Sequence, residues 1–118
     1  MTTAIDRLQA PAVAALEVAH QRACAVVEPA LIDLLTARIE HTLANGPMPA
    51  APIGDREREV AAIVDQMLVD VSAADDHLVG QANRHFTDGG LADVVMAAYI
   101  IEARTRLRVA AERLWSEA

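Results

Sequence analysis

Apolar residues recur three and four positions apart over five stretches of the chain, which is the spacing of one helical face. The first predicted helix begins near Pro11, because a proline suits the first turn, where its missing N–H is not needed. The second opens at Pro29 and closes at Asn45 and Gly46, a common C-terminal signal. The two stripes consist of Val13, Leu16, His20, Cys24 and Val27, then Leu31, Leu34, Leu35, Ile39 and Leu43.

Three further helices are predicted in the second half of the chain. Asp55 is expected to cap the N-terminus of the third, whose apolar face runs from Val60 to Val71. Residues 72–75, Ser-Ala-Ala-Asp, have the pattern of a capping box, so a fourth helix is predicted to start there and to carry Phe86. The last helix is predicted over residues 91–115. Its first half is apolar nearly all round, which is typical of a central helix or of one shared with another subunit.

The composition predicts one all-α domain. Residues 46–54 hold three of the five prolines and therefore form a loop, but the loop is too short to link two domains. Hydrophobic residues make up 53% of the 118 positions, aromatic residues only 3%, and Ala fills 25 positions, which suits close-packed helices. We expect a single domain over residues 1–118, a compact bundle of about five helices.

The net charge argues against nucleic acid and anionic membranes as partners. It is −7, from 17 acidic and 10 basic residues, and all the basic residues are Arg. Four of them crowd the C-terminal segment, which indicates either a solvated helix end that favours cations or an anion site. They are Arg104, Arg106, Arg108 and Arg113. The longest apolar run, residues 94–101, is too short to span a bilayer.

Cys24 is the only cysteine, which excludes an intramolecular disulfide and a CxxC redox pair. A cytosolic location is the default expectation, since the N-terminal residues also lack the pattern of a signal peptide. Many Ala and Arg residues without Lys are typical of a GC-rich bacterial genome. Because Cys24 lies on an apolar stripe, we expect a buried and inert thiol; a nucleophilic thiol would need His20 as its base.

Glu17 and His20 form one E-x-x-H pair, a spacing that places both side chains on one helical face, as in di-iron bundles. Such sites need two pairs and further carboxylates, and this sequence has a single pair. Two interpretations remain, a metal site completed by a symmetry mate and a surface or interface histidine. No cofactor is expected, since the sequence has no Gly-rich phosphate loop and no zinc-type Cys/His spacing.

Glu102 continues the apolar stripe of the last predicted helix, four residues after Ala98. A carboxylate in such a stripe needs a partner or must protonate. Arg106 lies one turn further on, and Arg38 and Glu40 on the second helix could reach Glu102 within a bundle. The pattern therefore predicts either a structural ion pair or an acid–base site with Glu102, Arg106 and Arg38 as candidate catalytic residues.

Four stretches, in order along residues 26–115, resemble the carboxymuconolactone decarboxylase and alkylhydroperoxidase-D-like family. Residues 27–40, with Glu-Pro-Ala-Leu near their start, resemble an early helix of that family. Residues 54–68 resemble its helix opening, which has an acid, one variable residue and then Glu-Arg, and residues 85–95 resemble its turn and next helix. Residues 98–107 are similar to its closing helix, in which Glu102 falls where many relatives have Asn or Asp and Arg106 matches an Arg.

The chain departs from that family at its reactive cysteines. Peroxidase members carry a C-x-x-C-x-x-x-H helix after the second helix, where this chain has the loop 46–54. Both cysteines and the histidine are missing, so thiol-dependent peroxide reduction is not expected. The resemblance implies an oligomer, since members assemble as dimers, trimers or hexamers.

Two classes of function remain open from the sequence. The first is a non-catalytic subunit that forms homo-oligomers or pairs with a homologous protein. The second is a small acid–base enzyme that uses Glu102, Arg106, Arg38 and a histidine on a small carboxylic acid or lactone. A helix-turn-helix DNA-binding protein is disfavoured, because the net charge is −7 and the helix after residues 87–90 is apolar.

Overall fold

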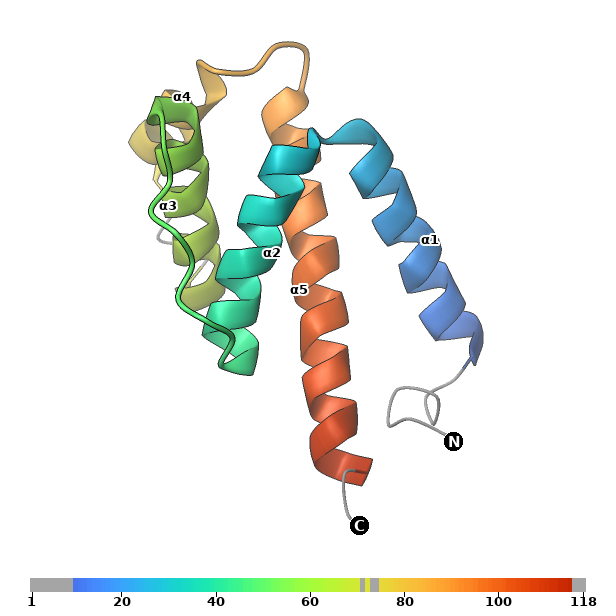
Figure 1. Ribbon diagram of the computed structural model, residues 1–118. Coiled ribbons are helices and arrows are strands. Elements are labelled where there is room, and N and C mark those ends of the chain that lie inside the picture. Colours follow the sequence, from blue (N-terminus) through green and yellow to red (C-terminus); the bar gives the residue numbers. More distant parts are fainter. Residues whose placement is uncertain (1–9, 71, 73–74, 116–118) are drawn as a thin grey trace.

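Over residues 10–70, 72 and 75–115, which the computed structural model describes, the chain folds into five α-helices without a β-strand (Figure 1). α1 spans Ala10–Val26, α2 Pro29–Ala44 and α3 Asp55–Val69. α4 spans Asp76–Asn83 and α5 spans Gly90–Trp115. The all-α class and the number of helices predicted from the apolar spacing are confirmed.

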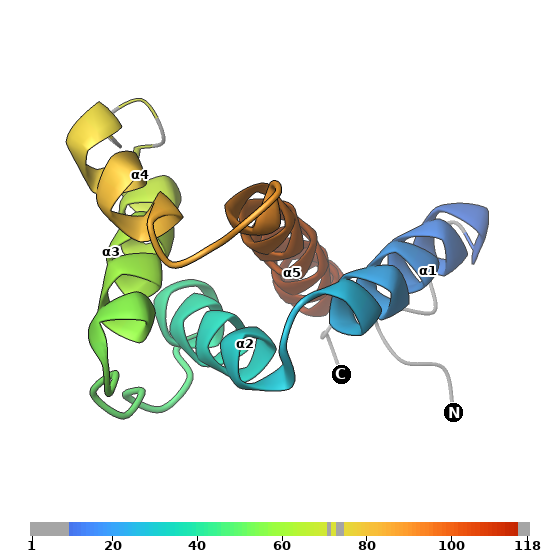
Figure 2. The ribbon, with the colours of Figure 1, turned by 90° about the horizontal axis from the view of Figure 1, so that it is seen from above.

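α5 is the longest helix, with 26 residues, and lies at the centre of the molecule (Figure 1). α1 and α2 pack against α5, α3 packs against α2, and α4 packs against α3 and α5. Seen from above, α1 and α3 lie on opposite sides of the α2–α5 pair (Figure 2). Within the described residues, neither α5 nor another helix is apolar over the length that a membrane crossing requires.

The core is aliphatic, as the composition predicts, and is built mainly from α2, α3 and α5. Its largest fully buried side chains are Leu31, Leu35 and Ile39 of α2 and Val60 of α3. Each such side chain stabilises the fold by about 1.5–3 kcal/mol through the apolar surface it removes from water. α1 contributes less, since Ala23 is the buried residue of this helix and Val27 follows it.

The ends of α2 and α3 agree with the predicted boundaries, with one correction. α2 starts at Pro29 and ends before Asn45, which adopts the left-handed conformation (φ 54°), as an Asn after a helix commonly does. α3 begins at Asp55, but its N-cap is Gly54, at φ 94° and without a side-chain cap. Asp55, predicted as the cap, is instead the first helical residue and pairs with Arg58 one turn on.

The predicted start of the fourth helix is wrong. Asp75, not Ser72, is the N-cap of α4, and its Oδ1 accepts a hydrogen bond of 2.8 Å from the backbone N–H of Leu78. The Ser72 hydroxyl donates to Asp70 Oδ1 at 2.7 Å, and residues 73–74 lie outside the described residues. α4 also ends before Phe86, which packs instead against the core from the turn that leads to α5.

Candidate functional site

Glu102, the acid predicted in the apolar stripe of α5, is largely buried and forms an ion pair within its own helix. Its side chain is 16% exposed, and its Oε2 accepts a hydrogen bond of 2.8 Å from Arg106 Nε. Arg38 and Glu40 bind other partners, Asp65 and Arg108. The candidate catalytic residues Glu102, Arg106 and Arg38 therefore do not form one site, since Arg38 binds Asp65. The geometry around Glu102 is that of a structural ion pair with Arg106, one of the two alternatives predicted from the sequence.

Arg38 joins α2 to α3 through a bidentate contact with Asp65. Its Nε donates to Asp65 Oδ1 at 2.9 Å and its Nη2 donates to Oδ2 at 2.5 Å. These hydrogen bonds raise the pKa of the Arg38 guanidinium above its ordinary value, although partial burial opposes them. Arg38 is therefore a fixed cation whose guanidinium plane is oriented by the facing helix.

A pocket of about 410 Å³ lies beside this ion pair, between α2, the loop of residues 45–54 and α3. Its polar wall carries two residues one turn apart on α2, Arg38 and His41, together with Thr42 and Asp65. The loop supplies the rest of the lining, Met48, Pro49, Ala50, Ala51 and Pro52. The family resemblance predicts a cysteine-containing helix at the position of this loop. In this chain the loop forms one wall of the pocket instead.

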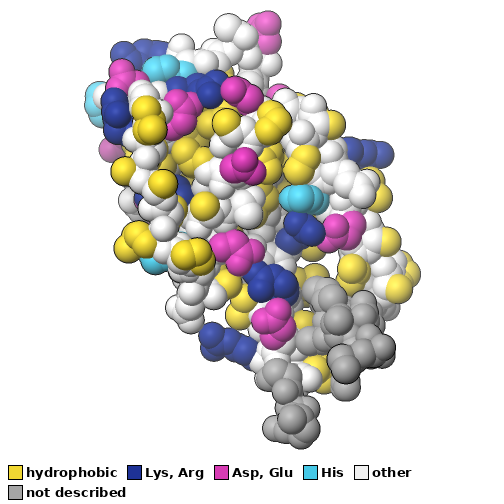
Figure 3. Space-filling view, viewed as in Figure 1, with side chains coloured by type: hydrophobic (Ala, Val, Ile, Leu, Met, Phe, Trp, Pro, Cys, Tyr) yellow, Lys and Arg dark blue, Asp and Glu magenta, His cyan; other side chains and the backbone are white. Residues whose placement is uncertain are grey.

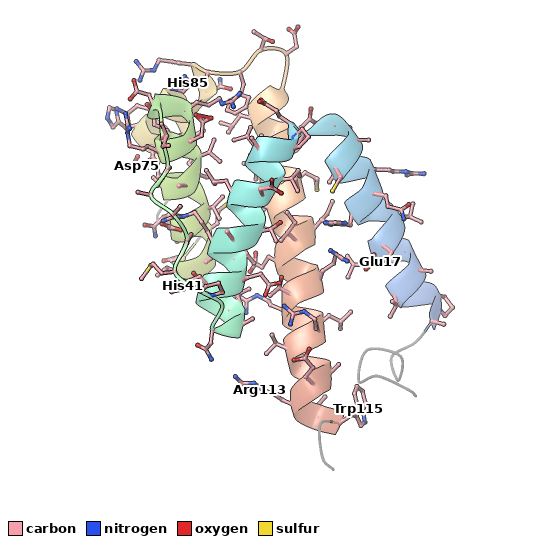
Figure 4. The ribbon with its side chains drawn as sticks, in the orientation of Figure 1. Glu17, His41, Asp75, His85, Arg113 and Trp115 are labelled. Carbon is pink, nitrogen blue, oxygen red and sulfur yellow. The ribbon has the colours of Figure 1, made fainter. Side chains whose placement is uncertain are left out.

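The C-terminal end of α2 fixes the imidazole of His41. His41 Nδ1 lies 3.0 Å from the carbonyl oxygen of Gly46, and a carbonyl can only accept, so Nδ1 carries the proton (Figure 4). The backbone N–H groups of Asn45 and Gly46 both donate to the Glu40 carbonyl, which holds this turn against the helix. In the neutral ring, Nε2 is therefore left as a hydrogen-bond acceptor.

Sequence reasoning singled out Arg38 but missed His41 and Asp65. The available signal was the spacing of Arg38 and His41 at i and i+3, just before a proline-rich loop that has to cross that helix end. Asp65 gave no such signal, because it is 27 positions from Arg38 and meets it only through the packing of α2 on α3.

Glu17 extends from α1 toward α5 and binds Arg104 (Figure 4). Arg104 Nε and Nη2 donate to the two carboxylate oxygens of Glu17 at 2.9 and 3.1 Å. Burial lowers the pKa of His20, and the positive charge of Arg104 lowers it further. Among the described residues, no group of three His, Cys, Asp or Glu side chains is placed to hold a metal ion.

Cys24 is exposed, which corrects the prediction of a buried thiol. It lies beside Ala23, the residue through which α1 is buried, so its side chain faces away from the packed side of the helix. Its Sγ is 3.8 Å from His20 Nε2 and 3.9 Å from Nδ1, at the outer limit of a weak sulfur contact.

Two of the four arginines of α5, Arg104 and Arg108, bind carboxylates from neighbouring helices. Arg108 Nη2 lies 2.7 Å from both carboxylate oxygens of Glu40 on α2, and Arg104 binds Glu17 on α1. The two pairs line a cleft of about 360 Å³ between these helices, where acidic and basic side chains lie side by side (Figure 3). Arg104 and Arg108 thus form interhelical ion pairs, an arrangement different from both the solvated face and the anion site considered from sequence.

A second, more apolar groove of about 250 Å³ lies between α1 and the first half of α5. Two large apolar side chains that line it remain exposed, Val26 of α1 at 64% and Met96 of α5 at 60%. One basic residue from α1, Arg22, and one acidic residue from α5, Asp93, also line the groove. Within the described residues, neither of these two charged side chains has an ion-pair partner.

No family model, curated protein or solved structure matches the chain. Over the described residues, the arrangement of the helices alone defines the class, an all-α bundle with a central helix. The resemblance of residues 26–115 to the carboxymuconolactone decarboxylase and alkylhydroperoxidase-D-like family stays a prediction.

Proposed function

We propose that the chain is a self-associating helical subunit of the carboxymuconolactone decarboxylase and alkylhydroperoxidase-D-like type, without the thiol chemistry of the peroxidase members. A second copy of the chain covers the groove between α1 and α5. The observation that carries this proposal is the exposure of Val26 and Met96 on the two sides of one apolar groove. Clustered apolar side chains of this size mark interaction surfaces, because leaving them in water is unfavourable.

The charges of the groove favour a second copy as the occupant. In an interface with two-fold symmetry each surface meets its own copy, so a residue on one side faces a different residue on the other. Arg22 and Asp93 lie in the same groove without partners among the described residues. A two-fold axis through the groove brings Arg22 of each copy to Asp93 of the other, and the apolar side chains between them are covered.

Charge reversal tests this pairing. Arg22→Asp and Asp93→Arg each place like charges together across the interface, so each single variant should weaken self-association about tenfold or more. The double variant restores opposite charges and should recover association. Sedimentation velocity over a concentration series measures this. Recovery in the double variant is expected, whereas equal association in all four proteins would overturn the proposed interface.

A second candidate function is acid–base catalysis on a small carboxylic acid or lactone. The observation that favours it is the anchored imidazole of His41 beside the guanidinium of Arg38, since one group can move a proton and the other can stabilise a developing negative charge. Turnover of simple lactones by the wild-type protein and its loss in His41→Phe test this function. Equal rates in both proteins would exclude His41 as the base.

A further inference from the structure

We infer that the pocket between α2, the loop of residues 45–54 and α3 binds a small, uncharged aromatic hydroxyl compound, with the hydroxyl group between Arg38 and His41. The inference concerns binding alone. It is independent of self-association through the groove between α1 and α5, which lies between a different pair of helices.

Arg38 offers one donor group that its structural contact does not use. The bidentate contact with Asp65 occupies Nε and Nη2, and Nη1 donates no hydrogen bond to another of the described residues. The side chain is 21% exposed and is held in place from the facing helix. Nη1 is therefore an oriented donor for an oxygen atom in the pocket, and a ligand need not order it first.

His41 offers the complementary acceptor. Because Nδ1 donates to the Gly46 carbonyl, the neutral ring presents the lone pair of Nε2 as its remaining polar group. A hydroxyl group is the simplest group that satisfies both residues, since its oxygen accepts from Arg38 Nη1 and its proton is donated to His41 Nε2. An ether or carbonyl oxygen can accept a hydrogen bond from Arg38 Nη1 but has no proton to donate to His41 Nε2.

The charges on the wall favour a neutral ligand. Arg38 and Asp65 are the charged groups that line the pocket, and their charges cancel. A carboxylate in the pocket would be attracted by Arg38 but repelled by Asp65. An ammonium group would be attracted by Asp65 but repelled by Arg38. An uncharged compound avoids both the repulsion and the loss of hydration that an ion suffers on entering a protein site.

The loop side of the pocket suits a flat ring. Pro49 and Pro52 have fixed backbone φ angles and present rigid apolar surfaces, and Met48 supplies a polarizable thioether. Methionine sulfur makes favourable contacts with aromatic rings. Met48 is 78% exposed, so a ring that lies against it would remove apolar surface from water.

Phenol is the probe for this inference, and the methionine methyl groups report where it binds. In protein labelled with ¹³C at the methionine methyls, phenol should shift the Met48 signal at millimolar concentration, whereas the signal of Met96, in the groove between α1 and α5, should stay in place. Anisole lacks the hydroxyl proton and should bind about tenfold more weakly. Benzoate should also bind more weakly than phenol.

His41→Phe keeps a ring but removes both nitrogens, and it should weaken phenol binding about tenfold. His77→Phe is the matched control, because His77 is exposed on α4 away from the pocket and its loss should leave binding unchanged. If His41→Phe fails to fold, anisole tests the same hydrogen bond in the wild-type protein. An unshifted Met48 signal at about 20 mM phenol, equal binding of phenol and anisole, or tighter binding of benzoate would each overturn the inference.

Discussion

Arginine side chains form the ion pairs that connect neighbouring helices of this protein. Arg38, Arg104 and Arg108 each present two or more contacts to a carboxylate on another helix. A planar guanidinium can hold a carboxylate through two parallel bonds, which the point charge of lysine cannot do. The use of Arg for all ten basic residues therefore has a structural consequence here, since these pairs fix how α1, α2 and α3 lie against their neighbours.

The Glu102–Arg106 pair predicts unequal effects of two substitutions. Arg106→Ala leaves a carboxylate that is 16% exposed without its cation and should lower the free energy of unfolding by about 1 kcal/mol. Glu102→Gln keeps an acceptor for Arg106 Nε and should cost less. Urea unfolding measures both changes, with Arg113→Ala as the control on the exposed end of α5. Stabilisation by Glu102→Gln would contradict the ion-pair interpretation and favour the alternative of an acid–base site at Glu102.

The lowered pKa of His20 predicts a pH dependence of stability. Burial of the ring, helped by Arg104, makes the folded chain bind a proton at lower pH than the unfolded chain does. As the pH falls below 6.5, the ordinary pKa of histidine, His20 is therefore protonated first in the unfolded state. The free energy of unfolding decreases from that pH downward until the pH has passed the lower pKa of His20 in the folded state.

His20→Gln removes this titration, so between pH 7.5 and pH 5.5 its stability should fall less steeply than that of the wild-type protein (pH limits about one unit either side of the histidine value). Thermal unfolding at intervals across this range measures the slopes. The exposed residue His77 provides the control, and His77→Gln should follow the wild-type curve. Identical slopes for His20→Gln and the wild-type protein would contradict the assigned pKa shift.

The helices could be predicted from the sequence because their signals are local. Apolar spacing, Pro29 at the start of α2 and Asn45 at its end lie within the helix or next to it. The ion pairs between helices could not be predicted, since Glu17 and Arg104, for example, are 87 positions apart and meet only when α1 packs on α5. The pocket of Arg38 and His41 likewise depends on where the loop of residues 45–54 crosses the end of α2.

The sequence misplaces the start of α4 because two nearby residues, Ser72 and Asp75, both have side chains that can cap a helix. Ser72 and Asp75 can each accept a hydrogen bond from a backbone N–H three positions on, and the sequence pattern fits both. The Ser72 hydroxyl binds Asp70, which leaves Asp75 as the cap. The competing local contact, rather than the propensity of either residue, decides where the helix begins.

Removal of the two candidate caps separates these alternatives. Asp75→Ala leaves the Leu78 N–H without its side-chain acceptor and should lower the free energy of unfolding by about 1 kcal/mol. Ser72→Ala should change it by less than about 0.5 kcal/mol, because Ser72 caps no helix. Chemical denaturation of both variants makes the comparison. A larger effect of Ser72→Ala would show that the helix begins at the earlier position.

At the scale of the whole molecule, α1 is the least embedded helix. It packs against α5, and Ala23 is its buried residue, whereas α2, α3 and α5 supply most of the core. The apolar first half of α5 is covered by α2 and α1 but leaves Met96 and Tyr99 exposed. A second copy over this face would bury the surface that one chain of 118 residues leaves in water.

The molar mass of the protein in solution tests the proposed self-association most directly. Light scattering coupled to size exclusion should give a multiple of the chain mass of 12.6 kDa for the wild-type protein. Met96→Glu places a charge in the apolar groove and should return the mass to that of one chain, whereas Val69→Glu, at a more exposed position on α3, should leave the assembly intact. A wild-type mass of 12.6 kDa at micromolar concentration would contradict the account.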